Sequence, residues 1–267
     1  MVDTRGILRP EEARRHFRLT RAKPAEDLAH LIERHWMVEW DLREPFTQEI
    51  VTHPSVNIAF QDPPTIHGVY TGRFRQELTG SGRVIATKFR PGGFHAFHPV
   101  PAVTLTDQVI LADTVFDHLR PTTFAEIEHG LRRHGWTDDP RIDEVNELHA
   151  AMLRDPNITR VEHLCTHAGY SKRTLQRLFR EYVGVTPKWV LDRIRLHEAA
   201  ERMADGADRG AAEVGGAGAE PRDELGARQL QLRLVIAPGS SIARMLAITG
   251  LDKTYPTYPT LDAALTA

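Results

Sequence analysis

Basic and amide side chains gather between residues 171 and 180, the part of the sequence best suited to binding another molecule. The segment reads SKRTLQRLFR and holds Lys172, Arg173, Arg177 and Arg180 without any acidic residue. Arginine and lysine neutralise phosphates, and arginine and glutamine also form paired hydrogen bonds with guanine and adenine edges. This composition is typical of a surface that binds DNA.

A helix over this segment would divide its side chains between two faces. Leu175, Leu178 and Phe179 recur at helical spacing and are expected to pack inward. The candidate DNA-binding residues are the serine expected to cap the helix and the side chains expected to face outward: Ser171, Lys172, Arg173, Thr174, Gln176, Arg177 and Arg180. The first half of such a helix approaches base pairs most closely, so Arg180 is expected to bind a phosphate.

A preceding helix must position this one. Val161, Leu164 and Cys165 lie on one face of it, and Ala168 and Gly169 form a tight corner between the two helices. The sequence therefore predicts a helix-turn-helix at roughly residues 158 to 182. The alternative is a packed helical hairpin with a merely solvated basic face.

Four histidines, His53, His67, His95 and His98, favour a different class, a cupin-like metal-dependent enzyme. However, His95 and His98 are three residues apart and would face opposite sides of an extended strand. No carboxylate at ligand spacing accompanies them. We therefore predict no enzyme activity, no catalytic residue, no metal site and no cofactor.

Short extended runs separated by proline and glycine fill residues 30 to 118, and helical patterns follow. We expect an α+β protein with an N-terminal antiparallel barrel or sandwich of cupin-like shape, then a helix-turn-helix subdomain, then a short β-α fragment. Aromatic residues of the β region, Trp36, Trp40, Phe60 and Phe94, either line a ligand cavity or form the core. The predicted domains are 1–118, a helical linker at 119–157, the DNA-binding part at 158–204, a Gly/Ala-rich connector at 205–229 and a C-terminal fragment at 230–267.

The global composition sets limits on partners and compartment. The 267 residues carry 34 basic and 36 acidic side chains, so any DNA affinity must come from a local patch. The single cysteine, Cys165, excludes an internal disulfide, and no stretch is apolar enough for a signal peptide or a membrane span. These features favour a cytoplasmic location without a membrane partner.

The run AGYSKRTLQRLFREYVGVTPKWVLDRIRLHEAAERM, with Gly184, Pro187 and Trp189 at its central corner, resembles the DNA-binding unit of the AraC/XylS transcription regulators. Upstream, TKFRPGGFHAF and LTDQVILAD are similar to an uncharacterised domain that often precedes this unit. The resemblance covers about residues 8 to 204. It implies a sequence-specific regulator of double-stranded DNA, a small-molecule effector in a sensory N-terminal domain, and a homodimer.

The sequence departs from this family after Met203, because the second helix-turn-helix of the family's DNA-binding unit is missing. DNA binding is therefore expected to be weakened. The last 38 or so residues instead resemble the closing strand and helices of a STAS domain, the fold of anti-sigma-factor antagonists. This resemblance keeps an interaction module open as an alternative, and the junction also fits a fused or frame-disrupted product.

Overall fold

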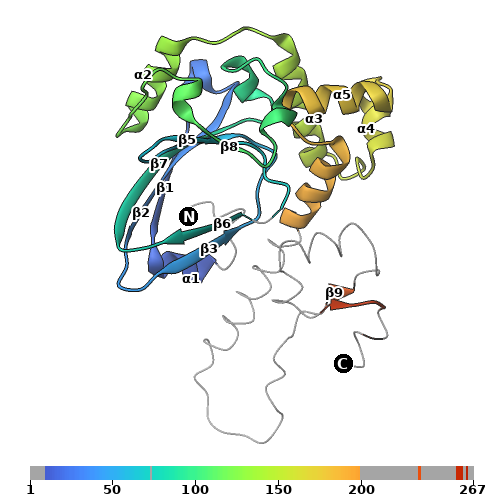
Figure 1. The fold of residues 1–267 in the computed structure, drawn as a ribbon. Coiled ribbons are helices and arrows are strands. Elements are labelled where there is room, and N and C mark those ends of the chain that lie inside the picture. Colours follow the sequence, from blue (N-terminus) through green and yellow to red (C-terminus); the bar gives the residue numbers. More distant parts are fainter. Residues whose placement is uncertain (1–9, 73, 199–233, 236–256, 261–262, 264–267) are drawn as a thin grey trace, which may run out of the picture. The chain divides into compact units, whose positions relative to one another are not determined.

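A computed structural model of the protein describes residues 10–72, 74–198, 234–235, 257–260 and 263 (Figure 1). The chain forms two compact units, Met1–Arg193 and Ile194–Ala267. In the second unit, β9 (Leu234–Val235) pairs in parallel with β10 (Thr257–Tyr258). In the sequence, the alternation of Leu230, Leu232, Leu234 and Ile236 predicts a strand, and β9 falls within it. The helix predicted after it, from Ser240 or Ser241 to Gly250, lies outside the described residues.

The first unit is built on a six-stranded antiparallel sheet in the order β1-β2-β7-β4-β5-β8. Its strands are β1 (Arg18–Ala22), β2 (Ile32–Asp41), β4 (Asn57–Phe60), β5 (Thr65–His67), β7 (Ser81–Phe89) and β8 (Val109–Leu111). A second sheet pairs β3 (Phe46–Ile50) with β6 (Phe74–Leu78). The short helix α1 (Pro10–His16) precedes β1.

The predicted antiparallel β domain is confirmed, but the closed cupin-like barrel is not. Among the described strands, β1 and β8 are the two edges of the large sheet and do not pair with each other. β8 has only three residues, and β3 and β6 pair with each other instead of closing the sheet. The domain is therefore an open sheet faced by a two-stranded ribbon.

Strand β2 shows why the large sheet has two different faces. In the sequence, Trp36, Val38 and Trp40 alternate with Met37 and Glu39, which predicts a strand, and all three face a cavity between the two sheets. His35 lies on the other face and is fully buried. The sequence AEDLAHLIERHWMVEW is expected to begin with a helical turn, and the 3-10 helix η1 (Glu26–Leu28) is present there.

The opposite face of the sheet is covered by α2 (Phe124–His134) (Figure 1). Thr123 caps this helix by accepting a hydrogen bond from the amide of Glu126, which fixes where the helix begins. Ile127 and Leu131 are completely buried, and each burial stabilises the fold by roughly 1.5–3 kcal/mol. Phe94 and Phe97, in and directly after the 3-10 helix η2 (Gly93–Ala96), extend the core together with Phe116, which follows η4 (Ala112–Thr114). A third connecting 3-10 helix, η3 (Ala102–Leu105), buries both of its end residues.

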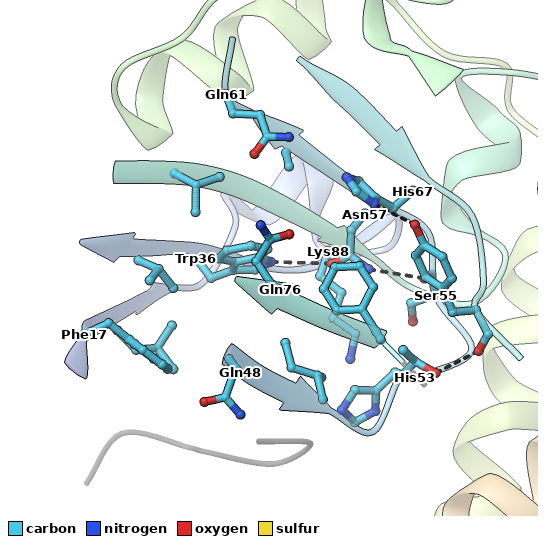
Figure 2. A pocket seen from close by; sticks show the side chains of 18 of the residues that line it. Phe17, Trp36, Gln48, His53, Ser55, Asn57, Gln61, His67, Gln76 and Lys88 are labelled. Carbon is cyan, nitrogen blue, oxygen red and sulfur yellow. Dashed lines mark hydrogen bonds between the residues drawn. The ribbon is translucent and has the colours of Figure 1, made fainter. Parts of the chain in front are cut away.

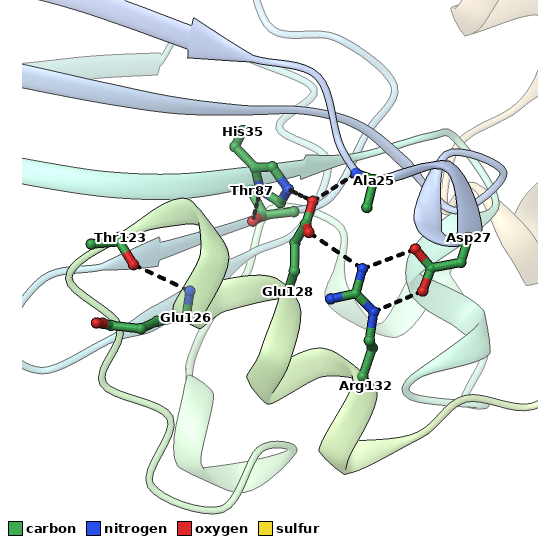
Figure 3. A network of polar contacts seen from close by, with 8 residues as sticks. All are labelled: Ala25, Asp27, His35, Thr87, Thr123, Glu126, Glu128 and Arg132. Atoms are coloured by element: carbon green, nitrogen blue, oxygen red, sulfur yellow. Dashed lines mark hydrogen bonds and ion pairs between the residues drawn. The ribbon is translucent and has the colours of Figure 1, made fainter.

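A polar network ties α2 to the sheet (Figure 3). His35 lies 3.3 Å from the Glu128 carboxylate and 2.8 Å from the Thr87 hydroxyl. A carboxylate only accepts hydrogen bonds, so neutral His35 donates from Nε2 and accepts from Thr87 at Nδ1. Arg132, one turn after Glu128, pairs with Asp27 at 2.7 Å. Burial lowers the pKa of His35 against the opposing effect of Glu128, which favours this neutral form.

Three further helices complete the first unit: α3 (Pro140–Arg154), α4 (Val161–Ala168) and α5 (Lys172–Tyr182). Helix α3, predicted as a linker, packs against both α4 and α5. Another helical segment covers residues 187–198. No helix in the described part of the chain is both long and apolar enough to cross a membrane.

We expect acid sensitivity from His149 on α3. Burial, with the charges of Lys88 and Arg90 adding to it and Glu33 opposing it, lowers the pKa of His149 to about 4. Below pH 6.5 the unfolded chain binds this proton and the folded chain does not, so stability falls as pH falls. Because of His149, the free energy of unfolding should fall by about 1 kcal/mol between pH 7.5 and 5.5. Urea unfolding at both values should show a smaller loss for His149→Gln; an equal loss in both proteins would contradict this assignment.

Candidate functional site

The predicted helix-turn-helix is present as α4 and α5 joined by a short turn. Gly169 ends α4 in the left-handed conformation, with φ of 67°, and the amide of Tyr170 donates to the Cys165 carbonyl at 3.1 Å. Glycine adopts this conformation without the steric cost that a Cβ brings. Ser171 then caps α5 by accepting from the amide of Thr174 at 3.1 Å. The corner and the cap are both where the sequence predicts them.

The inner face of α5 is an apolar stripe. Leu175 is completely buried, and Leu178, Phe179 and Tyr182 are at most 7% exposed. These side chains pack in the bundle formed with α3 and α4. The apolar face of α4 that holds Val161 and Leu164 predicts Cys165 as a small core residue, but it is only half-buried.

The outer face of α5 carries the candidate DNA-binding residues. Ser171, Lys172, Arg173, Gln176, Arg177 and Arg180 are exposed, and Thr174 is half-buried. Among the described carboxylates, none forms an ion pair with Arg173, Arg177 or Arg180. The three guanidinium groups are therefore exposed to solvent on the helix surface.

Lys172 differs from the arginines, because its ammonium lies 3.0 Å from the Glu162 carboxylate of α4. Sequence inspection of residues 171 to 180 missed this partner, since Glu162 comes from the neighbouring helix. Both side chains are more than half exposed, so the pair contributes little stability.

Direct contacts join the DNA-binding helices to the rest of the first unit. The Tyr182 hydroxyl donates to the Asp139 carboxylate at 2.7 Å, next to His95, whose ring centroid is 4.4 Å from that of Tyr182. Burial, and then the bond to Asp139, raise the pKa of Tyr182 to about 12, so the phenol stays neutral. Asp139 also caps α3 by accepting from the Arg141 amide. The end of α5 is thereby fastened to the start of α3.

Two more contacts follow α5. The Thr106 hydroxyl after η3 donates to the Gly184 carbonyl at 2.7 Å. Arg193 is 1% exposed, lies over the Trp189 ring at 4.4 Å and donates to the Thr71 carbonyl at 3.0 Å. Burial lowers the pKa of Arg193 to about 10. The corner between α5 and the next helix therefore rests on loops of the β domain.

Gly184 gives a direct test of this docking. Its φ is 91°, and an added Cβ would lie 2.8 Å from both the Ala102 carbonyl oxygen and the Thr106 hydroxyl. Gly184→Ala should lower the free energy of unfolding by roughly 1–3 kcal/mol in urea titrations. Gly72→Ala is the control, because a Cβ there meets nothing within 4 Å. Equal stability of the two variants would show that the corner is not constrained.

The histidines considered as metal ligands do not come together. His53 and His67 line the cavity between the sheets, whereas His95 lies in η2 and His98 follows it. An extended segment would place His95 and His98 on opposite faces, but this segment turns helically, with η2 over Gly93–Ala96. Within the described residues, no three potential ligands converge on one point.

The cavity is a second candidate site (Figure 2). It has a volume of about 230 Å³ and is lined by residues of β1 to β7, including Trp36 and Trp40. Phe60 and Phe94, the other two aromatic residues proposed from the sequence, are not among its lining residues but are buried. Sequence reasoning also missed Arg34, although it shares the even-numbered alternation of Trp36, Val38 and Trp40 along β2.

Comparison with known families matches two parts of the chain. Residues 164–217 match the model of a helix-turn-helix domain, and residues 20–111 match a domain of unknown function (DUF6597). The chain therefore carries a DNA-binding helix-turn-helix of the AraC type of transcription regulators, preceded by this N-terminal domain. The similarity of residues 230–267 to a STAS domain is not shown by these matches and stays a prediction. No curated protein and no solved structure matches the chain.

Proposed function

We propose that the protein is a sequence-specific transcription regulator that inserts the first half of α5 into the major groove of DNA. The observation that supports this most directly is the position of Arg173 and Arg177, which are exposed on a helix whose other face is buried. A helix fits the major groove, and arginine there pairs with the O6 and N7 atoms of guanine. Gln176 on the same face supplies the paired bonds that adenine requires.

The candidate contacts divide by their place on the helix. Ser171, Lys172, Arg173, Thr174, Gln176 and Arg177 lie in the first two turns and are proposed to contact base edges or nearby phosphates. Arg180 lies in the last turn of α5 and is proposed to bind a phosphate. Phosphate contacts fix the orientation of the helix, and base contacts supply its specificity.

A single helix-turn-helix reads a short site. We infer that the protein binds with reduced affinity and strong salt dependence, because one such motif contacts few phosphates. A homodimer would restore two half-sites spaced by one helical turn of DNA. Footprinting on a selected duplex distinguishes these cases, since a dimer protects two segments about 10 base pairs apart, centre to centre.

Neither alternative function has comparable support. A cupin-like enzyme requires converging ligands, which the described residues do not supply. An interaction module of the anti-sigma-antagonist type would depend on residues 230–267, of which the structure describes only a few.

The central test uses alanine variants of two arginines. The full-length protein is first used to enrich a binding site from a random-sequence duplex pool, and affinities are then measured by mobility shift. Arg173→Ala and Arg177→Ala should each weaken binding by about tenfold or more, corresponding to roughly 1–3 kcal/mol. If the lost contact is to a phosphate, the salt slope should also fall by about 1.

Arg133→Ala is the matched control for this test. Arg133 is an exposed arginine on α2, so its loss changes the net charge equally without touching α5. Its DNA affinity should equal that of the parent protein. If the Arg173 and Arg177 variants bind as tightly as this control, α5 is not the DNA-reading helix.

A further inference from the structure

The cavity between the large sheet and the β3–β6 ribbon has two chemically different ends. At one end, strand pairing places Arg34 opposite Lys88, and Asn57 opposite both Lys88 and His67. Further along β2, Val38 lies opposite Val84 and Leu19. Figure 2 shows the polar side chains Lys88, Ser55, Asn57 and His67 at one side and Phe17 at the other.

The charges of the cavity have one sign. Its described lining residues include Arg21, Arg34 and Lys88 and no carboxylate. Glu33, outside the lining, forms ion pairs with two of them, at 2.8 Å from Lys88 and 3.2 Å from Arg34. Lys88 is only 4% exposed, and this burial lowers its pKa to about 8 despite Glu33. A second anion beside Lys88 would relieve this cost of burying its charge.

The volume of the cavity limits the ligand. An apolar cavity of about 150 Å³ is sufficient to bind benzene. The observed volume of about 230 Å³ therefore leaves room for one ring or a short chain and a small head group. Trp36 adds a flat apolar wall, and its indole nitrogen is directed at Asn57, 3.5 Å away.

We propose that this cavity binds a small organic acid, with its ionised carboxylate beside Arg34 and Lys88 and its ring or short chain toward Val38 and Val84. The proposal deepens the proposed function by naming the chemistry of its effector, and only the regulatory role rests on that function. Binding itself requires no DNA.

The wall of the cavity also reaches the DNA-binding helices. Gly68 and Tyr70 line the cavity, and the carbonyl of the next residue, Thr71, accepts the bond from Arg193. The amide and the hydroxyl of Thr71 donate hydrogen bonds to the Asp107 carboxylate at 2.7 and 2.6 Å. A Cβ at Gly68 would lie only 1.7 Å from the Leu105 carbonyl oxygen, so this wall packs tightly on η3. A ligand that moves Tyr70 thus acts on the segment that supports the α5 corner.

Calorimetric titration without DNA tests the ligand class. The probes are 3-phenylpropanoate and octanoate, which place a ring or a chain behind the same carboxylate, and their primary amides, which are neutral. At least one acid should bind one-to-one. Its amide should bind at least about tenfold more weakly, since one charge-assisted hydrogen bond contributes about 1.5–3 kcal/mol. Equal binding of acid and amide, or no binding of either acid at millimolar concentration, overturns the proposal.

Variants identify the two cations. Lys88→Met and Arg34→Gln should each weaken binding of the acid by about tenfold and leave binding of the amide unchanged. Arg18→Gln is the matched control, because Arg18 is an exposed residue of β1 outside the cavity lining. If circular dichroism shows that Lys88→Met does not fold, Arg34→Gln decides; parental affinity of that variant for the acid overturns the proposal.

The affinity for the acid should depend on pH with a definite sign. Lys88 is a cation below its pKa of about 8 and loses its proton above it. Binding of the acid should therefore weaken as pH rises from 7 through 9, and the amide should show no such change. Because this measurement omits DNA, its failure leaves the role of α5 untouched, and a failed mobility shift leaves the cavity proposal untouched.

Discussion

Burial of the inner face of α5 is the constraint on which the functional surface depends. The side chains of Leu175 and Phe179 are almost completely buried, and an arginine in place of either would lose its hydration at a cost of several kcal/mol. The helix therefore has one orientation in which it packs, and in that orientation Arg173 and Arg177 point outward. Gly169 and Ser171 fix where this helix begins, and so which residues come first.

The same packing connects the DNA-binding helices to the β domain. Tyr182 is bonded to Asp139, Gly184 to Thr106 and Arg193 to Thr71, so three contacts hold α5 and the corner after it. All three partners lie in loops or at helix ends, where the backbone shifts more easily than in the sheet. Thr71 also adjoins the cavity wall. The β domain can therefore affect the DNA-binding helices through these three contacts.

How far the sequence predicts this structure differs from element to element. The helical spacing of Leu175, Leu178 and Phe179 was sufficient for α5, and the alternation of Trp36, Val38 and Trp40 was sufficient for β2. The same reasoning expected a barrel or sandwich of cupin-like shape, and the structure confirms the antiparallel sheet but not a closed barrel. Closure depends on pairing between strands far apart in the chain, and short alternation patterns do not specify which strands pair.

By itself, the sequence determined the local elements of the helix-turn-helix: the helix α5, its cap, the corner before it and the residues on its outer face. These follow from periodicity and turn chemistry within about 25 residues. Only the tertiary structure decided that Lys172 meets Glu162, that Arg34 and Lys88 share one cavity, and that Arg193 is buried against Thr71. These pairs come from separate elements, and their side chains meet only because apolar burial brings those elements together.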